Sequence, residues 1–246
     1  MRDDELAVDL ANAAGGLLME LRAQAADLGL DQSQLKKEGD RRSHELLMRR
    51  LAEDRPDDAV LSEEGADDEA RLSAARTWIV DPLDGTREYS EGRDDWAVHV
   101  ALATREGLAE GAVALPAVGL TLSSASPPAP PQPWEGGAPR LVVSRTRPPA
   151  EADRVAERLG CIKVEMGSAG AKAMAVVRGE ADIYLHAGGQ YEWDSAAPVA
   201  VALAAGFHAT RIDGSPLLYN QAPPYLPDLI ICRPELAEAI IAAARP

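Results

Sequence analysis

Hydrophobic residues at helical spacing open the chain, and strand-like runs follow them. An amphipathic helix is predicted over residues 4–26 because apolar side chains recur about once per turn, at Leu6, Leu10, Ala14, Leu17 and Leu21. A second helix is predicted over 41–53, with apolar positions one turn apart and Pro56 closing the following turn. Short apolar runs at 59–61 and 78–80 predict buried strands, and acidic residues follow both runs.

The middle of the chain has the alternation of half-buried strands. Every second residue is apolar from Trp96 to Leu102, and further strands are predicted at 108–114 and 118–122. Antiparallel pairing is the expected arrangement of these neighbours. The segment from Ser123 to Pro139 is rich in proline and small residues, cannot hold a regular ladder of hydrogen bonds, and is interpreted as an exposed connection.

Beyond this connection the pattern alternates between strand and helix. The predicted elements are strand 140–144, helix 150–159, strand 161–165, helix 169–178, strand 181–186, helix 195–205 and a final strand and helix. We therefore expect an α+β half at 1–122, the connection at 123–139, and an α/β half at 140–246, with a cleft between the halves. This organisation corresponds to a layered α/β fold.

Composition narrows the functional class. Hydrophobic residues make up 46% of the 246 residues, but no run approaches the roughly 18 apolar residues of a membrane span. The acidic N-terminus does not resemble a secretory signal, so a cytoplasmic location is expected. A net charge of −15 argues against nucleic-acid and anionic-membrane partners but allows a small anionic metabolite where cations reverse the local field. Cys161 and Cys232 are interpreted as buried free thiols, with a metal or redox role as the minor alternative.

The segment WIVDPLDGTREYSEG at 78–92 carries the strongest chemical signal. An apolar strand runs directly into Asp81 and Asp84, so two carboxylates leave the strand tip together. Pro82 removes a backbone donor and Gly85 permits an unusual backbone angle, which favours a turn that presents groups outward. If a helix begins near Thr86, its free N–H groups form a seat for phosphate beside the two acids.

Further acids follow other predicted elements. Glu63 and Glu64 end an earlier strand, and Asp194 precedes an apolar helix. Hard oxygen ligands without neighbouring histidine or cysteine favour Mg²⁺ or Mn²⁺. Several carboxylates around two such ions hold a phosphate and activate water, so the hypothesis is a magnesium-dependent phosphomonoesterase.

Each of these signals has a plain structural alternative. DPLDGT alone is a turn with a helix cap, Glu63–Glu64 alone is a solvated loop, and Asp194 alone is the N-cap of helix 195–205. Their joint occurrence after apolar runs favours the metal site.

The motifs VLSEE, DPLDGT and WDSAA, in this order and spacing, resemble those of the magnesium-dependent, lithium-sensitive phosphatases related to inositol monophosphatase. The match spans nearly the whole chain. DPLDGTREY, VVSRT at 142–146 and GSAGAK at 167–172 are most similar to the CysQ-type 3′-phosphoadenosine 5′-phosphate phosphatases. The resemblance implies an αβαβα layered sugar-phosphatase fold with two or three Mg²⁺ ions, replaceable by Mn²⁺, at the junction of the halves. It also implies inhibition by Li⁺ and suggests a homodimer.

The resemblance also implies roles for individual residues. The implied metal ligands are Glu63, Asp81, the Leu83 carbonyl, Asp84 and Asp194. Gly85 and Thr86 match the residues that hold the scissile phosphate, and Asp40, placed ahead of the second helix, matches the aspartate that orients the attacking water with Thr86. An ordinary N-cap is the alternative for Asp40. The family commonly has threonine three residues before this aspartate, where this chain has Lys37.

The distal contacts of a nucleotide are implied by a second group of matches. These residues are Ser144, Arg145, Ser168 and Lys172. Arg147 and His186 depart from the family pattern, and GSAGAK has one inserted residue. Tyr191 and Trp193 are candidates to border the substrate, with core packing favoured for Trp193. The histidines His44, His99 and His208 are interpreted as structural or exposed.

The implied reaction is removal of the 3′-phosphate of 3′-phosphoadenosine 5′-phosphate to give AMP in sulfur assimilation, with the sulfated analogue as a further candidate substrate. An inositol-1-phosphate or fructose-1,6-bisphosphate phosphatase is the close alternative, because it would use the same carboxylates. A catalytically silent regulator that binds magnesium or phosphate is the alternative from another class.

Overall fold

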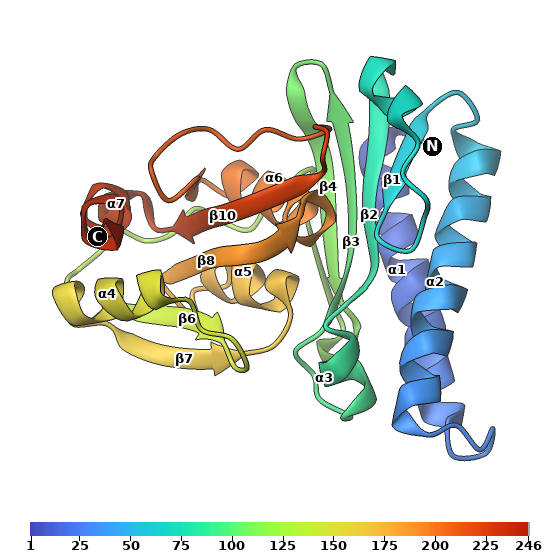
Figure 1. Ribbon diagram of the computed structural model, residues 1–246, viewed down its shortest axis with the longest axis horizontal. Helices are drawn as coiled ribbons and strands as arrows, with labels where there is room; N and C mark the ends of the chain where they lie inside the picture. Colours follow the sequence, from blue (N-terminus) through green and yellow to red (C-terminus); the bar gives the residue numbers. More distant parts are fainter. Residues whose placement is uncertain (246) are drawn as a thin grey trace.

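Helices and sheets alternate across the computed structural model, which describes residues 1–245. Figure 1 shows the layers in order: α1 and α2, the first sheet, α5 and α6, the second sheet, and then α4 and α7. The helices are α1 (Asp3–Gln24), α2 (Gln32–Asp54), α3 (Thr86–Ser90), α4 (Ala150–Leu159), α5 (Ala169–Val177), α6 (Ala196–Ala204) and α7 (Ala237–Ala244). This arrangement confirms the predicted αβαβα fold.

The first sheet holds the strand that carries the DPLDGT motif. Its strands, in spatial order, are β1 (Ala59–Ser62), β2 (Arg76–Asp84), β3 (Ala97–Thr104), β4 (Gly107–Leu115) and β5 (Leu120–Ser123). The expected antiparallel pairing holds from β2 to β5, whereas β1 pairs with β2 in parallel. β2 does not end before the motif as expected but continues to Asp84, with an irregular register against β3 between Asp81 and Asp84.

The second helix starts earlier than its hydrophobic pattern predicts. α2 begins at Gln32 rather than near 41, because Asp31 and Gln34 form a capping box in which each side chain accepts a hydrogen bond from the other's backbone N–H. The first turns are largely solvent-exposed and therefore lack the apolar positions on which the prediction depended. Asp40 consequently lies inside α2, and both its predicted place ahead of the helix and the N-cap alternative are wrong.

The second sheet combines parallel and antiparallel pairs. Its strands, in spatial order, are β7 (Ile162–Met166), β6 (Arg140–Ser144), β8 (Ile183–Tyr191), β10 (Tyr225–Cys232) and β9 (His208–Thr210). β6 pairs in parallel with β7 and β8, while β10 is antiparallel to β8 and β9. The single final strand expected from the sequence is thus two strands, and β8 extends five residues beyond its predicted end at 186.

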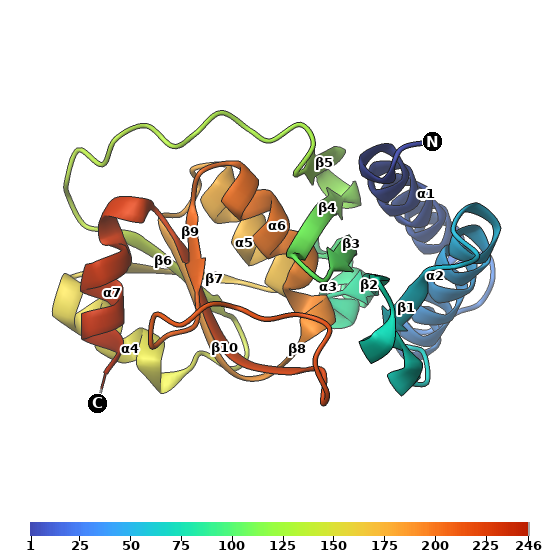
Figure 2. The same ribbon diagram turned by 90° about the horizontal axis from the view of Figure 1, so that it is seen from above.

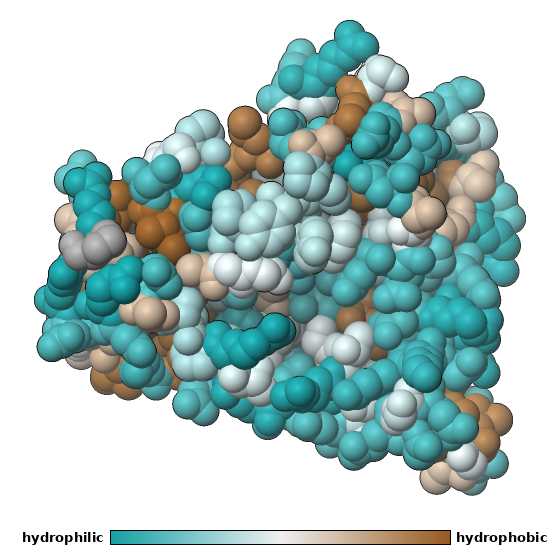
Figure 3. Space-filling model, viewed as in Figure 1, coloured by the Kyte–Doolittle hydropathy of each residue, from teal (hydrophilic) through white to brown (hydrophobic). Residues whose placement is uncertain are grey.

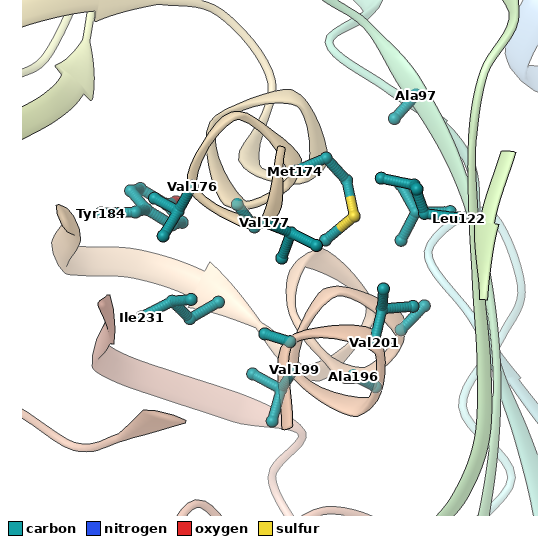
Figure 4. Packing of buried hydrophobic residues seen from close by; sticks show 14 of the residues in the cluster. Ala97, Leu122, Met174, Val176, Val177, Tyr184, Ala196, Val199, Val201 and Ile231 are labelled. Carbon is teal, nitrogen blue, oxygen red and sulfur yellow. The ribbon is translucent and has the colours of Figure 1, made fainter. Parts of the chain in front are cut away.

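The largest apolar core lies between the two sheets. α5 and α6 are buried along most of their length, as expected for helices that pack on both sides. Met174 of α5 points toward Leu122 of the first sheet, and Val176 of α5 and Tyr184 of the second sheet belong to the same core (Figure 4). Separate cores lie under α1 and α2 and under α4 and α7. The middle layer therefore fixes the two sheets relative to each other.

The segment from 124 to 139 crosses between the sheets without regular helix or strand (Figure 2). Its carbonyl at Gln132 accepts a hydrogen bond from Arg233 (2.7 Å), and Trp134 lies against the Arg233 guanidinium. Most of its residues are exposed, as the sequence predicts. The face seen in Figure 3 is mainly hydrophilic, and hydrophobic residues appear there in small separate groups. Within residues 1–245, no helix is long and apolar enough to cross a membrane.

Candidate active site

A cavity of about 560 Å³ lies between the two sheets. Its wall includes the end of β2, the start of α3, the loop after β6, the start of α5 and the end of β8. The predicted site residues among its lining are Glu63, Asp81, Leu83, Asp84, Gly85, Thr86, Ser144, Arg145, Ser168, Lys172 and Asp194. Residues from both halves of the chain therefore meet around one space.

Three carboxylates converge in this cavity. Asp81 and Asp84 come from the end of β2, and Asp194 ends a short 3₁₀ turn, η3 (Glu192–Asp194), directly before α6. One carboxylate oxygen from each residue lies within 4.8 Å of those of the other two. In a regular strand, side chains three residues apart point to opposite faces of the sheet. The irregular register of β2 between Asp81 and Asp84 allows both carboxylates to face the cavity.

Two of the three carboxyl groups, those of Asp81 and Asp194, are disfavoured in their ionised form. Burial and the charges of Glu63, Asp84 and Asp194 raise the pKa of Asp81 well above its usual range. Burial and the charge of Asp84 raise the pKa of Asp194 to about 7. Clustered carboxylates with raised pKa values are typical of sites that bind a cation. The three residues are thus suited to hold a divalent metal ion.

Asp84 differs from its neighbours because cationic and hydrogen-bonding groups surround it. Its Oδ2 accepts hydrogen bonds from Ser168 Oγ (2.5 Å) and the Gly170 amide (2.7 Å), and His99 Nε2 lies 3.3 Å away. Burial alone would raise the pKa of this carboxyl, but His99, Lys172 and Ser168 outweigh that effect and lower it. Asp84 is therefore the carboxylate of the three that is held ionised.

Gly85 forms the turn from β2 into α3. Its φ of 87° lies in the left-handed region, and a side chain there would place Cβ 3.0 Å from Ser168 Cβ and 3.3 Å from Trp96 Cβ. Glycine alone satisfies both conditions. α3 starts at Thr86, which meets the condition that the sequence analysis set for a phosphate seat, and Gly85 and Thr86 both line the cavity next to the carboxylates.

The other predicted metal ligands and Asp40 lie around this centre. Glu63 lines the cavity, and reduced hydration of its carboxyl together with the charges of Asp84 and Glu64 raises its pKa. Leu83 is buried and its amide donates to Asp81 Oδ1 (3.0 Å). Asp40 is absent from the described cavity lining, but burial and the charges of Glu64 and Glu63 raise its pKa to about 7. The Asp40 carboxyl is thus coupled to the acidic side of the site.

The residues predicted to bind the distal part of a substrate already have partners within the protein. The Arg145 guanidinium donates to Glu88 Oε1 and Glu91 Oε2, each at 2.8 Å. Lys172 is buried, its Nζ donates to the Ser168 carbonyl (2.5 Å), and it lies over the Tyr184 ring. These contacts hold two cationic side chains at the cavity wall.

Several residues of the site were not singled out from the sequence. Lys36 lines the cavity, whereas Lys37, which the sequence singled out, is exposed. His99, interpreted only as structural or exposed, is fully buried, contacts Asp84, and bonds through Nδ1 with the Trp193 carbonyl (2.9 Å). The alternation in β3 placed His99 on the face opposite Val98 and Val100. No local pattern showed that this second face is also buried, or that it meets Asp84.

The remaining singled-out side chains have varied environments. Trp193 packs against the core as expected, while Tyr191 stacks on it at 4.8 Å and is exposed. Cys161 and Cys232 are both free thiols, as predicted, but Cys161 is only partly buried.

Comparisons with known proteins agree with this geometry. A model described as the inositol monophosphatase family matches residues 2–128 and 137–246. The 3′-phosphoadenosine 5′-phosphate phosphatase of Mycobacterium leprae is 52% identical over 100% of this chain and 94% of that relative. The 3′(2′),5′-bisphosphate nucleotidase CysQ of Escherichia coli is 32% identical over 75% of this chain and 79% of that relative. The crystal structure of CysQ from Bacteroides thetaiotaomicron has a TM-score of 0.80 and 25% identity, covering 94% of this chain and 97% of that one.

The two sheets with helices in the outer and middle layers, the carboxylate cluster between them and the family match together identify a layered α/β phosphatase. The chain belongs to the inositol monophosphatase family. The sequence-based predictions of this family and of a phosphatase are thereby confirmed.

Proposed function

We propose that this protein hydrolyses the 3′-phosphate of 3′-phosphoadenosine 5′-phosphate to give AMP, with Mg²⁺ as its cofactor. The observation that carries the proposal is the meeting of Asp81, Asp84 and Asp194 with the cations Arg145 and Lys172 around one cavity. Carboxylates suit a hard divalent cation, while Arg and Lys suit a second phosphate group. The relative from M. leprae, which is 52% identical and named for this reaction, supports the choice of substrate.

The carboxylates of Glu63, Asp81, Asp84 and Asp194 and the Leu83 carbonyl would hold two or three Mg²⁺ ions, for which Mn²⁺ can substitute. When bound, the cations supply positive charge to the reacting phosphoryl group and lower the pKa of water. Asp84 contributes a ligand that stays ionised, because His99 and Ser168 hold its charge in place.

The groups around this centre have complementary tasks in the proposal. Gly85 and Thr86 hold the scissile phosphate at the start of α3. Asp40, whose carboxyl is coupled to Glu63 and Glu64 on the acidic side of the site, orients the attacking water together with Thr86. Arg145, Lys172, Ser144 and Ser168 contact the distal part of the nucleotide.

The test is phosphate release with Mg²⁺ from 3′-phosphoadenosine 5′-phosphate, inositol-1-phosphate and fructose-1,6-bisphosphate in parallel. A preference in kcat/KM of about a hundredfold for the nucleotide, or roughly 2.7 kcal/mol in transition-state binding, is expected. Equal or reversed values would overturn the nucleotide assignment and leave a sugar-phosphate or broad phosphatase. No release from any substrate would instead support a silent metal-binding regulator.

Two variants connect this activity to the site. Asp84→Asn is expected to lower kcat by at least about a hundredfold with the circular dichroism spectrum preserved. Lys172→Met is expected to raise KM for the nucleotide by about tenfold or more, because a charge-assisted contact is lost. Their matched controls are Asp153→Asn and Lys163→Met, which remove the two partners of an exposed ion pair on α4 and β7. Equal effects of variant and control would contradict the assignment.

A further inference from the structure

Arg71 is a buried charge that the proposed reaction does not use. It lies in the 3₁₀ helix η1 (Glu69–Ser73), between β1 and β2, and is 1% exposed. It does not belong to the described lining of the cavity. Burying a guanidinium is costly unless its donors are satisfied, so its partners indicate what it stabilises.

The partners of Arg71 come from two distant parts of the chain. Its Nε and Nη2 bind the two carboxylate oxygens of Asp67, at 2.6 and 3.0 Å. Its Nη1 donates to Asn220 Oδ1 and its Nη2 to the Gln221 carbonyl, both at 2.8 Å. Asn220 Nδ2 returns a hydrogen bond to the Arg71 carbonyl at 3.0 Å. Arg71 therefore joins the loop after β1 to the loop between β9 and β10.

The second of these loops is bonded in turn to the element that carries Asp194. The amides of Asn220 and Gln221 donate to the two carboxylate oxygens of Glu192, at 2.6 and 2.7 Å. Glu192 is 1% exposed and begins η3, the single turn that ends at Asp194. The φ of 59° at Asn220 is part of the turn in which both amides face one carboxylate.

The loop after β1 leads to the other side of the site. Asp67 lies four residues after Glu63, in the loop that follows β1. A short segment of chain thus connects Arg71 to Glu63, and hydrogen bonds through the loop between β9 and β10 connect it to the turn that ends at Asp194. Both of those residues line the cavity, but they come from different halves of the chain.

We propose that the Arg71 network, which comprises Asp67, Arg71, Glu192, Asn220 and Gln221, positions Asp194 relative to Glu63 and so sets the affinity of the site for its divalent cation. The inference rests on the proposed function. Mutually repelling carboxylates need external support to remain close together, and a planar guanidinium with fixed donors supplies it across the gap between the halves. Arg71 is accordingly a positioning residue and touches neither cation nor substrate.

Two substitutions weaken the network at different points. Arg71→Lys keeps the charge but cannot reproduce the fork to Asp67 together with the bonds to Asn220 and Gln221. Asn220→Gly removes only the side-chain bonds with Arg71, keeps the backbone N–H to Glu192, and suits the positive φ, so this variant is expected to fold. Arg233→Met is the control, because Arg233 also joins distant segments through Asp182 and Gln132, on a side of the fold that does not line the cavity.

The measurement is the melting temperature of each full-length protein during titration with Mg²⁺ alone, followed by kcat and KM at saturating Mg²⁺. Both network variants are expected to need about tenfold more Mg²⁺ for half-maximal stabilisation, with kcat largely recovered at saturation. Arg233→Met is expected to have a lower melting temperature in EDTA than the wild-type protein. Its Mg²⁺ concentration for half-maximal stabilisation is expected to be unchanged.

Midpoints for Arg71→Lys and Asn220→Gly within about twofold of the wild-type value would overturn the inference, even if both variants melt earlier. A midpoint shift of equal size in the control would also overturn it, because the effect would then follow from general destabilisation. A wild-type protein with neither Mg²⁺ stabilisation nor turnover would overturn the proposed function together with this inference. The two failures are therefore distinguishable.

Discussion

Ser168 Oγ donates a hydrogen bond to Asp84 Oδ2 over 2.5 Å, joining the start of α5 to the end of β2. The same hydroxyl oxygen accepts the Ala171 amide at 3.0 Å and so caps α5. Ser168, which the sequence predicts to contact substrate, therefore also holds the Asp84 carboxylate in place. The single hydroxyl links the middle helical layer to the candidate metal site.

Removal of this hydroxyl is expected to affect stability as well as turnover. Ser168→Ala loses both a helix cap and a bond to a buried carboxylate, so the free energy of unfolding should fall by about 1–2 kcal/mol. Urea unfolding of the metal-free protein measures this change. The control is Ser144→Ala, since Ser144 Oγ accepts the Arg147 amide at a longer 3.2 Å. An equal loss in both variants would contradict the capping and support assigned to Ser168.

Gly85→Ala is expected to destabilise the turn at the site. The left-handed φ costs a non-glycine residue roughly 1–2 kcal/mol, and the contact with Ser168 Cβ at 3.0 Å adds to this cost. Gly92→Ala is a matched control, because Gly92 has a φ of 76° but its Cβ would meet no described atom within 4 Å. Thermal unfolding should therefore show a larger decrease in melting temperature for Gly85→Ala than for Gly92→Ala. A larger loss at Gly92 would show that close packing around Gly85 is unimportant.

Asp81→Asn is expected to stabilise the metal-free protein while removing its response to Mg²⁺. Burial and neighbouring charges disfavour the ionised form of Asp81 in the folded state, so a neutral amide relieves repulsion. In EDTA the melting temperature should rise by about 2–4 °C, equivalent to roughly 1 kcal/mol for a chain of this size. Asp95→Asn should do the opposite, because Asp95 is paired with Arg93 and the Gly167 amide. A lower melting temperature for Asp81→Asn in EDTA would refute this electrostatic account.

Asp182 is expected to contribute to stability at neutral pH and to lose that contribution in acid. Burial tends to raise its pKa, but hydrogen bonds from Arg140 and Arg233 outweigh burial and lower it. Because the folded pKa is depressed, the contribution is present above the unfolded value of about 3.9 and is lost as the pH falls through the folded pKa. Asp182→Asn should therefore cost about 1–3 kcal/mol at pH 7. Denaturant unfolding as a function of pH should show this difference shrinking below about pH 4, and a constant difference would contradict it.

Local patterns in the sequence were sufficient for most elements. The 150–159 helix coincides with α4, and the strand predicted at 140–144 coincides with β6. Such elements can be predicted because the spacing of their apolar residues, or the residues that cap them, lie within or next to the element. The start of α2 was missed because its first turns are mostly exposed, although the signal of Asp31 and Gln34 was present three residues apart.

The sequence by itself determined that carboxylates end several apolar elements, and that a proline and a glycine stand where β2 gives way to α3. These features depend only on neighbouring residues. Only the tertiary structure decided that His99 lies beneath Asp84, that Arg145 pairs with Glu88 and Glu91, and that Arg71 reaches Asn220. Those contacts join residues separated by up to 149 positions. They exist because the middle helical layer fixes the two sheets, and no local pattern encodes the relative placement of distant elements.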